Sequence, residues 1–393
     1  MLSQRQLFLL NTAQTSNSPR SLEIESAEGI YLFDTNGQKY IDLVSGFAVS
    51  NVGHRHPKVV RAIKDQADKF LHVTVYGEYI QSPQVLFATT LCSILPPALN
   101  SVYFVNSGTE ATEGAMKLAK RFTGRCEIVS CINSYHGSTQ GALSLMGNEH
   151  YKQAYRPLLP GVRMMRFNVM EDLEQISTET AAVFMETIQG EAGVVVPGRE
   201  YMQALSKRCH DTGALLVLDE IQTGFGRTGK LFGFEHFDIV PDILLLAKGM
   251  GGGMPIGAFI ADKVIMDAFK ENPILGHITT FGGHPVSCAA GLAALNVLLD
   301  EKLTEGVAVK EQLFRDCLQH PKIKEIRGKG LLLSVQLSSF AEVEKVSKTC
   351  VDNGLIVDWF LHNETSLRVA PPLIISEENI REACRILIEA LNN

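Results

Sequence analysis

Short apolar runs recur through the middle of the chain, and several end abruptly in one polar residue. The three clearest runs, each given with the residue that follows it, are 181–185 before Glu186, 214–218 before Asp219 and 243–247 before Lys248. Runs this short and uniformly apolar are typical of strands buried on both faces, as in a parallel sheet covered by helices. Because ligands of such sheets bind in the crevice at the carboxyl ends of the strands, we predict that Asp219 and Lys248 share one crevice.

A strand, a glycine-containing loop and a helix follow one another closely at residues 101–121. The strand is expected over 101–105, the loop contains Ser107, Gly108 and Thr109, and the helix is expected to begin near Glu110. This arrangement presents free backbone N–H groups to an anion. Short connections between strands and helices are also common without any ligand, so an ordinary turn explains the pattern equally well.

The two ends of the chain have different patterns. The apolar runs 29–33 and 39–43 flank an Asn-Gly turn and predict a β-hairpin. A helix of small residues over 286–299 is expected to connect two domains, and beyond about residue 305 short strands alternate with helices. Ser376 is expected to cap the last helix.

Composition narrows the class of protein. Of the 393 residues, 45% are hydrophobic and 20% are charged, which is ordinary for a soluble globular protein. The formal net charge of −7 argues against a nucleic-acid surface. No apolar stretch reaches the roughly 18 residues of a membrane span, and the N-terminal segment has no convincing signal-peptide cleavage site. The eight cysteines show no CxxC spacing, which favours reduced thiols in a cytoplasmic protein and leaves no metal site to predict.

The stretch 224–229 matches the pattern GxGxxG. A dinucleotide-binding turn needs those glycines directly between a strand and a helix. Here five residues separate the strand from the first glycine, and 230–234 carry no helix signature. We therefore interpret the stretch as a loop, and an NAD-dependent dehydrogenase stays the less favoured alternative.

Lys248 differs from an ordinary solvated strand end because its neighbours are apolar or glycine. Desolvation favours the neutral amine, which is the nucleophilic form. A buried salt bridge between Lys248 and Asp219 would explain the same pattern. Schiff-base chemistry on pyridoxal phosphate would need an anion site, a carboxylate for the pyridine nitrogen, an aromatic ring and an arginine for the substrate carboxylate. The chain offers a candidate for each: the loop at Ser107, then Asp219, Tyr135 and Arg368.

Several stretches make the sequence resemble the class III (ω-amino acid type) aminotransferases, which depend on pyridoxal 5′-phosphate and include acetylornithine, ornithine and 4-aminobutyrate aminotransferases. The resemblance covers about residues 20 to 390, and its most specific stretch is LLVLDEIQTGFGRTGKLFGFEHFDIVPDILLLAKGMGGGMPIGA. Supporting stretches are FVNSGTEATEGAMKLAKR, SYHGST, TIQGEAGV, TTFGGHP and LRVAPPL. The resemblance implies an α/β protein of the fold type I of these enzymes. A large domain (51–295) would contain a mostly parallel seven-stranded sheet, and both chain ends (1–50 and 296–393) would form a smaller α+β domain.

The resemblance also implies roles for individual residues. Lys248 would hold the cofactor as a Schiff base and then move the substrate proton. Asp219 would pair with the pyridinium nitrogen, and Gln222 would bond the phenolic oxygen of the ring. Glu186 would only support its neighbours. The other cofactor-binding residues would be Tyr135 stacked on the ring, His136 beside it, Ser107, Gly108 and Thr109 at the phosphate, and Thr280 of the partner subunit in a homodimer that shares its active sites.

Four further positions concern the substrate. In the family, the arginine that matches Arg368 binds a carboxylate, and the glutamate that matches Glu191 pairs with it when an ω-amine enters. Phe47 would line the substrate entrance. Ser138 stands where acetylornithine-type members usually carry arginine, which argues against acetylornithine as substrate. The expected activity is a ping-pong transfer from an amino acid or ω-amine to a 2-oxo acid such as 2-oxoglutarate; an aminomutase or epimerase of the same fold is the alternative.

Overall fold

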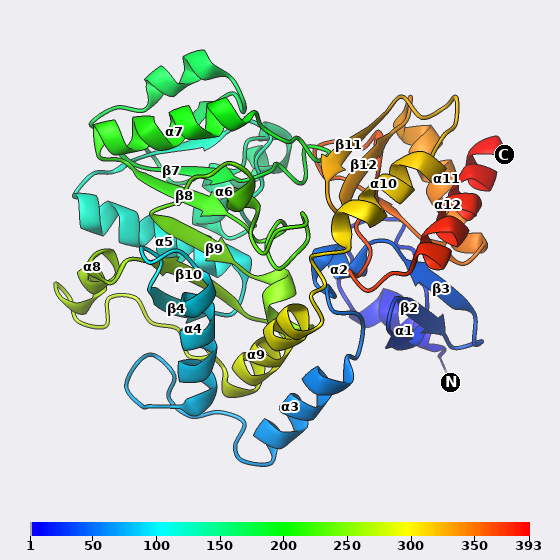
Figure 1. Cartoon of the computed structure of the whole chain (residues 1–393), viewed down its shortest axis with the longest axis horizontal. Coiled ribbons are helices and arrows are strands. Elements are labelled where there is room, and N and C mark those ends of the chain that lie inside the picture. Colours follow the sequence, from blue (N-terminus) through cyan, green and yellow to red (C-terminus); the bar gives the residue numbers. More distant parts are fainter. Residues whose placement is uncertain (1) are drawn as a thin grey trace.

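A seven-stranded sheet forms the centre of the larger part of the molecule (Figure 1). The computed structural model describes residues 2–393. The strand order is β4-β10-β9-β8-β7-β5-β6, and β10 runs opposite to the strands on both of its sides. The seven strands are β4 (Ser101–Val105), β5 (Glu127–Cys131), β6 (Val162–Met165), β7 (Thr180–Glu186), β8 (Leu215–Asp219), β9 (Ile243–Leu246) and β10 (Gly257–Ala261). The predicted mostly parallel, seven-stranded sheet is therefore confirmed.

Both faces of this sheet are covered, which explains why its strands are apolar throughout. In β8, Leu215 and Val217 pack into one buried cluster with α5 (Gly108–Thr123), while Leu216 and Leu218 pack into the other with α7 (Arg199–Thr212). All five residues of β8 are buried, including Asp219 at its end. A strand with no solvent-facing side loses the alternation of apolar and polar residues.

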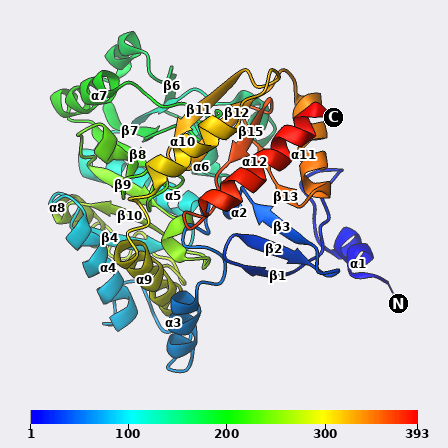
Figure 2. The same ribbon diagram turned by 45° about the vertical axis from the view of Figure 1, so that its right-hand side comes forward.

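The two chain ends meet in the smaller part of the molecule. One sheet pairs the hairpin with a late strand, because β3 (Lys39–Asp42) runs parallel to β13 (Leu355–Ile356). Figure 2 shows the blue N-terminal strands beside the orange and red C-terminal elements. The other strands are β1 (Ile24–Glu28) and β2 (Tyr31–Asp34) in this sheet, and β11 (Glu325–Lys329), β12 (Leu332–Gln336), β15 (Ser366–Val369) and β14 (Asp358–Trp359) in a second sheet.

Helices complete the two parts. The remaining α-helices are α1 (Gln4–Asn11), α2 (Ser45–Ala48), α3 (Pro57–Ala67), α4 (Ser82–Ile94), α6 (Gln140–Leu145), α8 (Lys263–Met266), α9 (Pro285–Asp300), α10 (Val307–Cys317), α11 (Phe340–Asp352) and α12 (Glu377–Asn392). The short 3-10 helices are η1 (Glu149–Tyr151), η2 (Gln153–Tyr155), η3 (Met170–Gln175), η4 (Gly233–His236), η5 (Lys248–Gly251) and η6 (Asp267–Lys270). Among residues 2–393, none of the helices combines the length and apolar character that a membrane span requires.

Local predictions succeed best where the pattern is strong. The hairpin at β2 and β3 and the cap of α12 by Ser376 are confirmed. The helix expected near Glu110 begins two residues earlier, at Gly108, and α1 was not predicted. Short strands, among them β13 and β14, alternate with helices beyond residue 305, as expected. Residues 221–230, which contain the GxGxxG match, form turns between β8 and η4, and no helix follows the last glycine directly.

Candidate active site

A cavity of about 560 Å³ lies at the carboxyl ends of β7, β8 and β9. Three residues at strand ends line it. Glu186 is the last residue of β7, Asp219 is the last residue of β8, and Lys248 is the second residue after β9. Of the predicted site residues, the cavity is lined by Ser107, Gly108, Thr109, Tyr135, His136, Asp219, Gln222 and Lys248. It is not lined by Phe47, Glu191, Arg368 or Thr280.

Asp219 is held by two donors. Its Oδ2 lies 2.8 Å from Nδ1 of His136, and its Oδ1 accepts the backbone N–H of Ile221 at 2.9 Å. Burial alone would lower the pKa of His136, but the hydrogen bond and charge of Asp219 raise it above its ordinary value. The ion pair of Asp219 is therefore with His136, so the simple Asp219–Lys248 salt bridge is not what the structure contains. No local sequence pattern indicates this contact, because the two residues lie 83 positions apart.

Lys248, the second residue after β9, adopts a positive φ of 49° within a glycine-rich turn. Burial lowers the pKa of its amine below the ordinary value, and the charge of Arg368 acts in the same direction. The carboxylates of Glu191, Asp219 and Glu186 oppose this shift. A larger fraction of neutral amine follows, which is the form that attacks a carbonyl carbon and accepts a proton.

The N-terminus of α5 opens onto the cavity. The Ser107 hydroxyl accepts the backbone N–H of Glu110 at 3.3 Å and so caps the helix. The loop after β5 approaches this terminus closely, since a Cβ on Gly137 would lie 2.3 Å from Oγ1 of Thr109. Gly137 also has a φ of 129°, so a larger residue would be both strained and obstructed there. The first turn of α5 is therefore left with free N–H groups, beside residues too small to fill the space in front of them.

Glu186 and the loop after β5 are joined by hydrogen bonds. The carboxylate of Glu186 accepts the backbone N–H of Tyr135 at 3.0 Å and that of Gly190 at 2.8 Å. Burial raises the pKa of Glu186 to about 7, although the positive His136 opposes the shift. The Tyr135 hydroxyl lies 3.1 Å from that of Ser138. Glu186 thus positions the loop that carries Tyr135 and His136.

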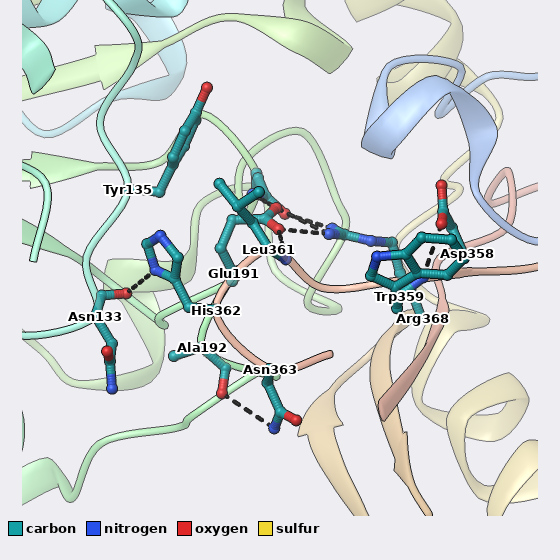
Figure 3. Close-up of polar contacts among 12 residues, drawn as sticks. Asn133, Tyr135, Glu191, Ala192, Asp358, Trp359, Leu361, His362, Asn363 and Arg368 are labelled. Atoms are coloured by element: carbon teal, nitrogen blue, oxygen red, sulfur yellow. Dashed lines mark hydrogen bonds and ion pairs between the residues drawn. The ribbon is translucent and has the colours of Figure 1, made fainter. Parts of the chain in front are cut away.

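Arg368 and Glu191 form a buried ion pair beside the cavity (Figure 3). Nη2 of Arg368 lies 2.9 and 2.8 Å from the two carboxylate oxygens of Glu191. Gln222 bridges the pair, because its Nε2 donates to Glu191 at 2.9 Å and its Oε1 accepts from Arg368 at 3.2 Å. The guanidinium also packs on the rings of Phe360 and Phe47, at 4.3 and 5.2 Å. Burial would raise the pKa of Glu191, but Arg368 and the N–H of Leu361 lower it to about 2.

Thr280 does not line the cavity. It is exposed, in a stretch of the surface where Ile278 and Phe281 are exposed as well. Sequence reasoning missed Tyr151, whose hydroxyl bonds to the Leu361 carbonyl, and His362, whose ring bonds to the Asn133 carbonyl. No sequence motif marks either residue, and only the fold brings them there.

The chain belongs to the class III aminotransferases. The family model described as aminotransferase class-III matches residues 12–391. The protein is therefore a pyridoxal-phosphate-dependent transaminase, and a nicotinamide-dependent dehydrogenase finds no support.

Individual relatives differ in the substrate that they are named for. The chain is 41% identical to an acetylornithine aminotransferase of Caldanaerobacter subterraneus subsp. tengcongensis, over 93% of each chain. It is 39% identical to a putrescine aminotransferase of Pectobacterium atrosepticum, over 91% of this chain and 79% of that one. The solved ornithine aminotransferase of Toxoplasma gondii is 31% identical with a TM-score of 0.92, covering 100% of this chain and 96% of that one. A further structure of the Toxoplasma enzyme is described with pyridoxal phosphate at partial occupancy in its active site.

The cavity fits this cofactor. The free N–H groups at the start of α5 suit a phosphate, and the space in front of them is kept open by Gly137. Asp219 has one donor on each oxygen and still lines the cavity, so it can accept another from a protonated ring nitrogen. Lys248, with its lowered pKa, lines the same cavity.

Proposed function

We propose that the enzyme moves an amino group from an ω-amine or amino acid donor to a 2-oxo acid, with 2-oxoglutarate as the preferred acceptor, by a ping-pong mechanism. The observation that carries the proposal is the buried Arg368–Glu191 pair. An arginine that is neutralised by its own glutamate suits a donor that brings no carboxylate to that position. The same arginine suits the carboxylate of a 2-oxo acid once its bonds to the glutamate are broken.

The proposed roles of the site residues follow from their surroundings. When bound, pyridoxal phosphate supplies an aldehyde that exchanges amines and a ring that accepts an electron pair. Lys248 would hold the cofactor covalently, and its neutral Nζ would accept the proton from the substrate carbon and return it. Asp219, hydrogen-bonded to His136, would hold a proton on the ring nitrogen. Ser107, Gly108 and Thr109 would bind the phosphate, and Tyr135 would pack on the ring.

For Gln222 we propose a second contact besides the one that the family resemblance implies. It would contact the phenolic oxygen of the ring, as the family resemblance implies. Its amide also bridges Glu191 and Arg368, at 2.9 and 3.2 Å. The residue would therefore link the cofactor edge to the substrate-carboxylate site.

The donor is proposed to lack a carboxylate at the end distant from the amine that is transferred. Lys248 is the one lysine or arginine among the residues that line the cavity, and Ser138 offers only a hydroxyl. A carboxylate at the far end of the donor would have no cation from this lining to pair with. This favours diamines such as putrescine over acetylornithine, although both are substrates after which relatives of the chain are named.

We also propose a homodimer in which Thr280 completes the phosphate site of the partner subunit. Large apolar side chains are exposed on two segments, 71–86 and 274–281, and the most exposed of these are Leu71, Tyr79, Ile80, Leu86, Ile274, Leu275 and Phe281. Extended apolar surface of this kind marks an interface between proteins. The exposed Thr280 lies within the second segment.

The division of the chain into 1–50, 51–295 and 296–393 remains our proposal for its domains, and the pairing of β3 with β13 supports joining the two ends. A cytoplasmic location is proposed as well. All eight cysteines are free thiols in the described part of the chain, which is the state expected in a reducing compartment.

A donor panel tests the proposed function. Putrescine, 4-aminobutyrate, ornithine, lysine and acetylornithine would each be assayed with 2-oxoglutarate and with pyruvate. We expect the ω-amines without a distal carboxylate to have the highest kcat/KM, and acetylornithine to improve about 10-fold or more in Ser138→Arg through a charge-assisted contact. Ser138→Ala is the matched control. If acetylornithine were the best donor of the wild-type enzyme, the proposed donor class would be contradicted. Turnover of a donor without any added 2-oxo acid would favour a mutase or epimerase.

A further inference from the structure

The loop between β14 and β15, residues 360–365, lies against Glu191 (Figure 3). The N–H of Leu361 donates to Oε2 of Glu191 at 3.0 Å, and the N–H of His362 donates to the backbone carbonyl of Glu191 at 3.0 Å. Both the side chain and the main chain of Glu191 are therefore held by two successive residues of this loop, which we call the β14–β15 loop.

The same two residues are fixed to the larger part of the molecule. The Tyr151 hydroxyl donates to the carbonyl of Leu361 at 2.8 Å. Nδ1 of His362 donates to the carbonyl of Asn133 at 2.9 Å. The His362 ring also packs on Tyr151, with 5.4 Å between ring centroids, and edge-on against Tyr135 at 6.5 Å. The peptide units around Leu361 thus have contacts on both sides, which leaves the Leu361 N–H little freedom to turn away from Glu191.

When a substrate carboxylate binds Arg368, some contacts of Glu191 must break and others can persist. A substrate carboxylate that takes Arg368 displaces the two bonds from its guanidinium to Glu191. Glu191 is 8% exposed, so its charge does not reach bulk water without a larger movement. The donors that remain are the Leu361 N–H on Oε2 and the Gln222 amide on Oε1. A buried carboxylate without donors is costly, so these two bonds matter most when Arg368 is occupied by substrate.

We infer that the β14–β15 loop, fixed by His362 and Tyr151, holds Glu191 while a 2-oxo acid occupies Arg368. His362 and Tyr151 are then positioning residues that favour the acceptor half-reaction over the donor half-reaction. The inference rests on the proposed function, because it requires Arg368 to alternate between Glu191 and a substrate carboxylate. In the donor half-reaction Glu191 stays paired with Arg368, so a loosened loop costs little there.

The test uses His362→Ala and Tyr151→Phe in the holoenzyme. Each half-reaction is followed separately by stopped-flow absorbance, and the affinity for glutarate, a dicarboxylate that cannot react, is measured by calorimetry. We expect His362→Ala to weaken 2-oxoglutarate and glutarate binding by about 5- to 10-fold and Tyr151→Phe by about 2- to 5-fold, which is the worth of one hydrogen bond. The donor half-reaction should change by less than about 2-fold.

Two further variants separate positioning from a general loosening of the loop. His362→Asn retains an N–H near the place of Nδ1 and should recover most of the lost affinity. Asn363→Ala is the matched control, because Asn363 lies in the same loop and reaches the carbonyl of Ala192 at 3.5 Å without touching Leu361 or the Glu191 side chain. It should leave glutarate affinity unchanged.

Equal changes in both half-reactions, no change in either, or the same loss in Asn363→Ala would overturn the inference. Failure of the proposed function is seen elsewhere, in a wild-type enzyme that binds glutarate but accepts no amine from the donor panel. In that case the glutarate affinities of the variants still decide the role of the loop.

Discussion

The two halves of the active site are built in different ways. Asp219 and Lys248 come from adjacent parallel strands, β8 and β9, whose hydrogen-bonded register brings their ends together. Arg368 and Glu191 lie 177 positions apart, on β15 and on the turn after β7, and meet where the smaller part of the molecule touches the larger. The first half is fixed by one sheet, whereas the second depends on how two parts of the molecule pack.

This difference matches two kinds of chemistry. A cofactor stays in place through both half-reactions, so the groups around it gain from a rigid sheet edge. In the proposed function, a substrate carboxylate binds Arg368 in only one of the two half-reactions, so Arg368 would need a partner that can be exchanged. An ion pair across a junction, with further donors from Leu361 and Gln222, allows such an exchange without leaving the Glu191 carboxylate bare of hydrogen-bond donors.

Replacing Lys248 should give the largest effect. Lys248→Ala removes the amine that would hold the cofactor and move the proton, so we expect kcat to fall by about 10³-fold or more. The free energy of unfolding should hold or rise, because a desolvated amine is removed. The visible absorbance of the bound cofactor and the rate of transamination measure the first effect, and urea denaturation the second. A Lys248→Ala variant that still transaminated would remove the basis for treating this half as the catalytic one.

The rigid half of the site is also the one that the sequence predicted best. Strand-end residues can be recognised from the local pattern of apolar residues. Strand pairing within the sheet then brings these residues together, without depending on segments far away in the sequence. The Asp219–His136 bond and the bridge by Gln222 were not predicted, because they depend on how loops from separate strands approach one another. Likewise, nothing local indicates that Tyr151 and His362 meet at Leu361.

One helix that was not predicted, α1, and one that was expected to begin too late, α5, have signals that could have been used. Ser3 and Gln6 form a capping box at the start of α1, and Ser107 caps α5 with Glu110 three residues later. The spacing Ser-x-x-Gln or Ser-x-x-Glu marks a helix start in the sequence itself. The roles assigned to individual site residues stay predictions, because the fold brings side chains together without showing what they bind.

Glu191→Gln addresses the exchangeable half and should have the next largest effect. It leaves the buried Arg368 without a negative partner, so the donor half-reaction should slow by about 10-fold while 2-oxoglutarate still binds. The free energy of unfolding should fall by about 3 kcal/mol at neutral pH, as expected when one member of a buried pair is removed. Single-turnover kinetics measure the rate of the donor half-reaction, and urea denaturation measures the free energy of unfolding. A donor half-reaction unaffected by this change would mean that Glu191 does not neutralise Arg368 for the donor.

The same variant carries a pH signature. The folded-state pKa of Glu191 is about 2, below its ordinary value of 4.5. A lowered carboxyl pKa contributes stability that is complete above the ordinary value and is lost as the pH falls toward the folded-state value. The difference in unfolding free energy between wild type and Glu191→Gln should therefore be constant from pH 8 to about 5 and shrink between about 4.5 and 3. If the difference in unfolding free energy instead increased as the pH fell, the pKa of Glu191 would not be lowered in the folded state.

Arg227→Lys tests the connection between the two halves and should have the smallest effect on activity. Arg227 follows β8 and is completely buried. It donates to the carbonyls of Leu331 and Pro371 and to the side chain of Asn51, and thereby ties the sheet edge to the chain just beyond Arg368. Burial lowers the pKa of the guanidinium to about 9, against the opposing charge of Asp42, so a less well-bonded cation is costly here.

The single ammonium group of lysine cannot reach all the acceptors that the two guanidinium nitrogens of Arg227 bond, so some of the acceptors of Arg227 would lose their hydrogen bond. We expect the free energy of unfolding to fall by about 2 kcal/mol and the KM for 2-oxoglutarate to rise by about 3-fold, with the donor half-reaction nearly unchanged. Arg385→Lys, at an exposed arginine paired with Glu389, is the control and should stay within about 0.5 kcal/mol of wild type. If Arg227→Lys instead altered the donor and acceptor half-reactions alike, the junction would be supporting the whole site, and the contrast between a fixed cofactor half and an adjustable carboxylate half would no longer hold.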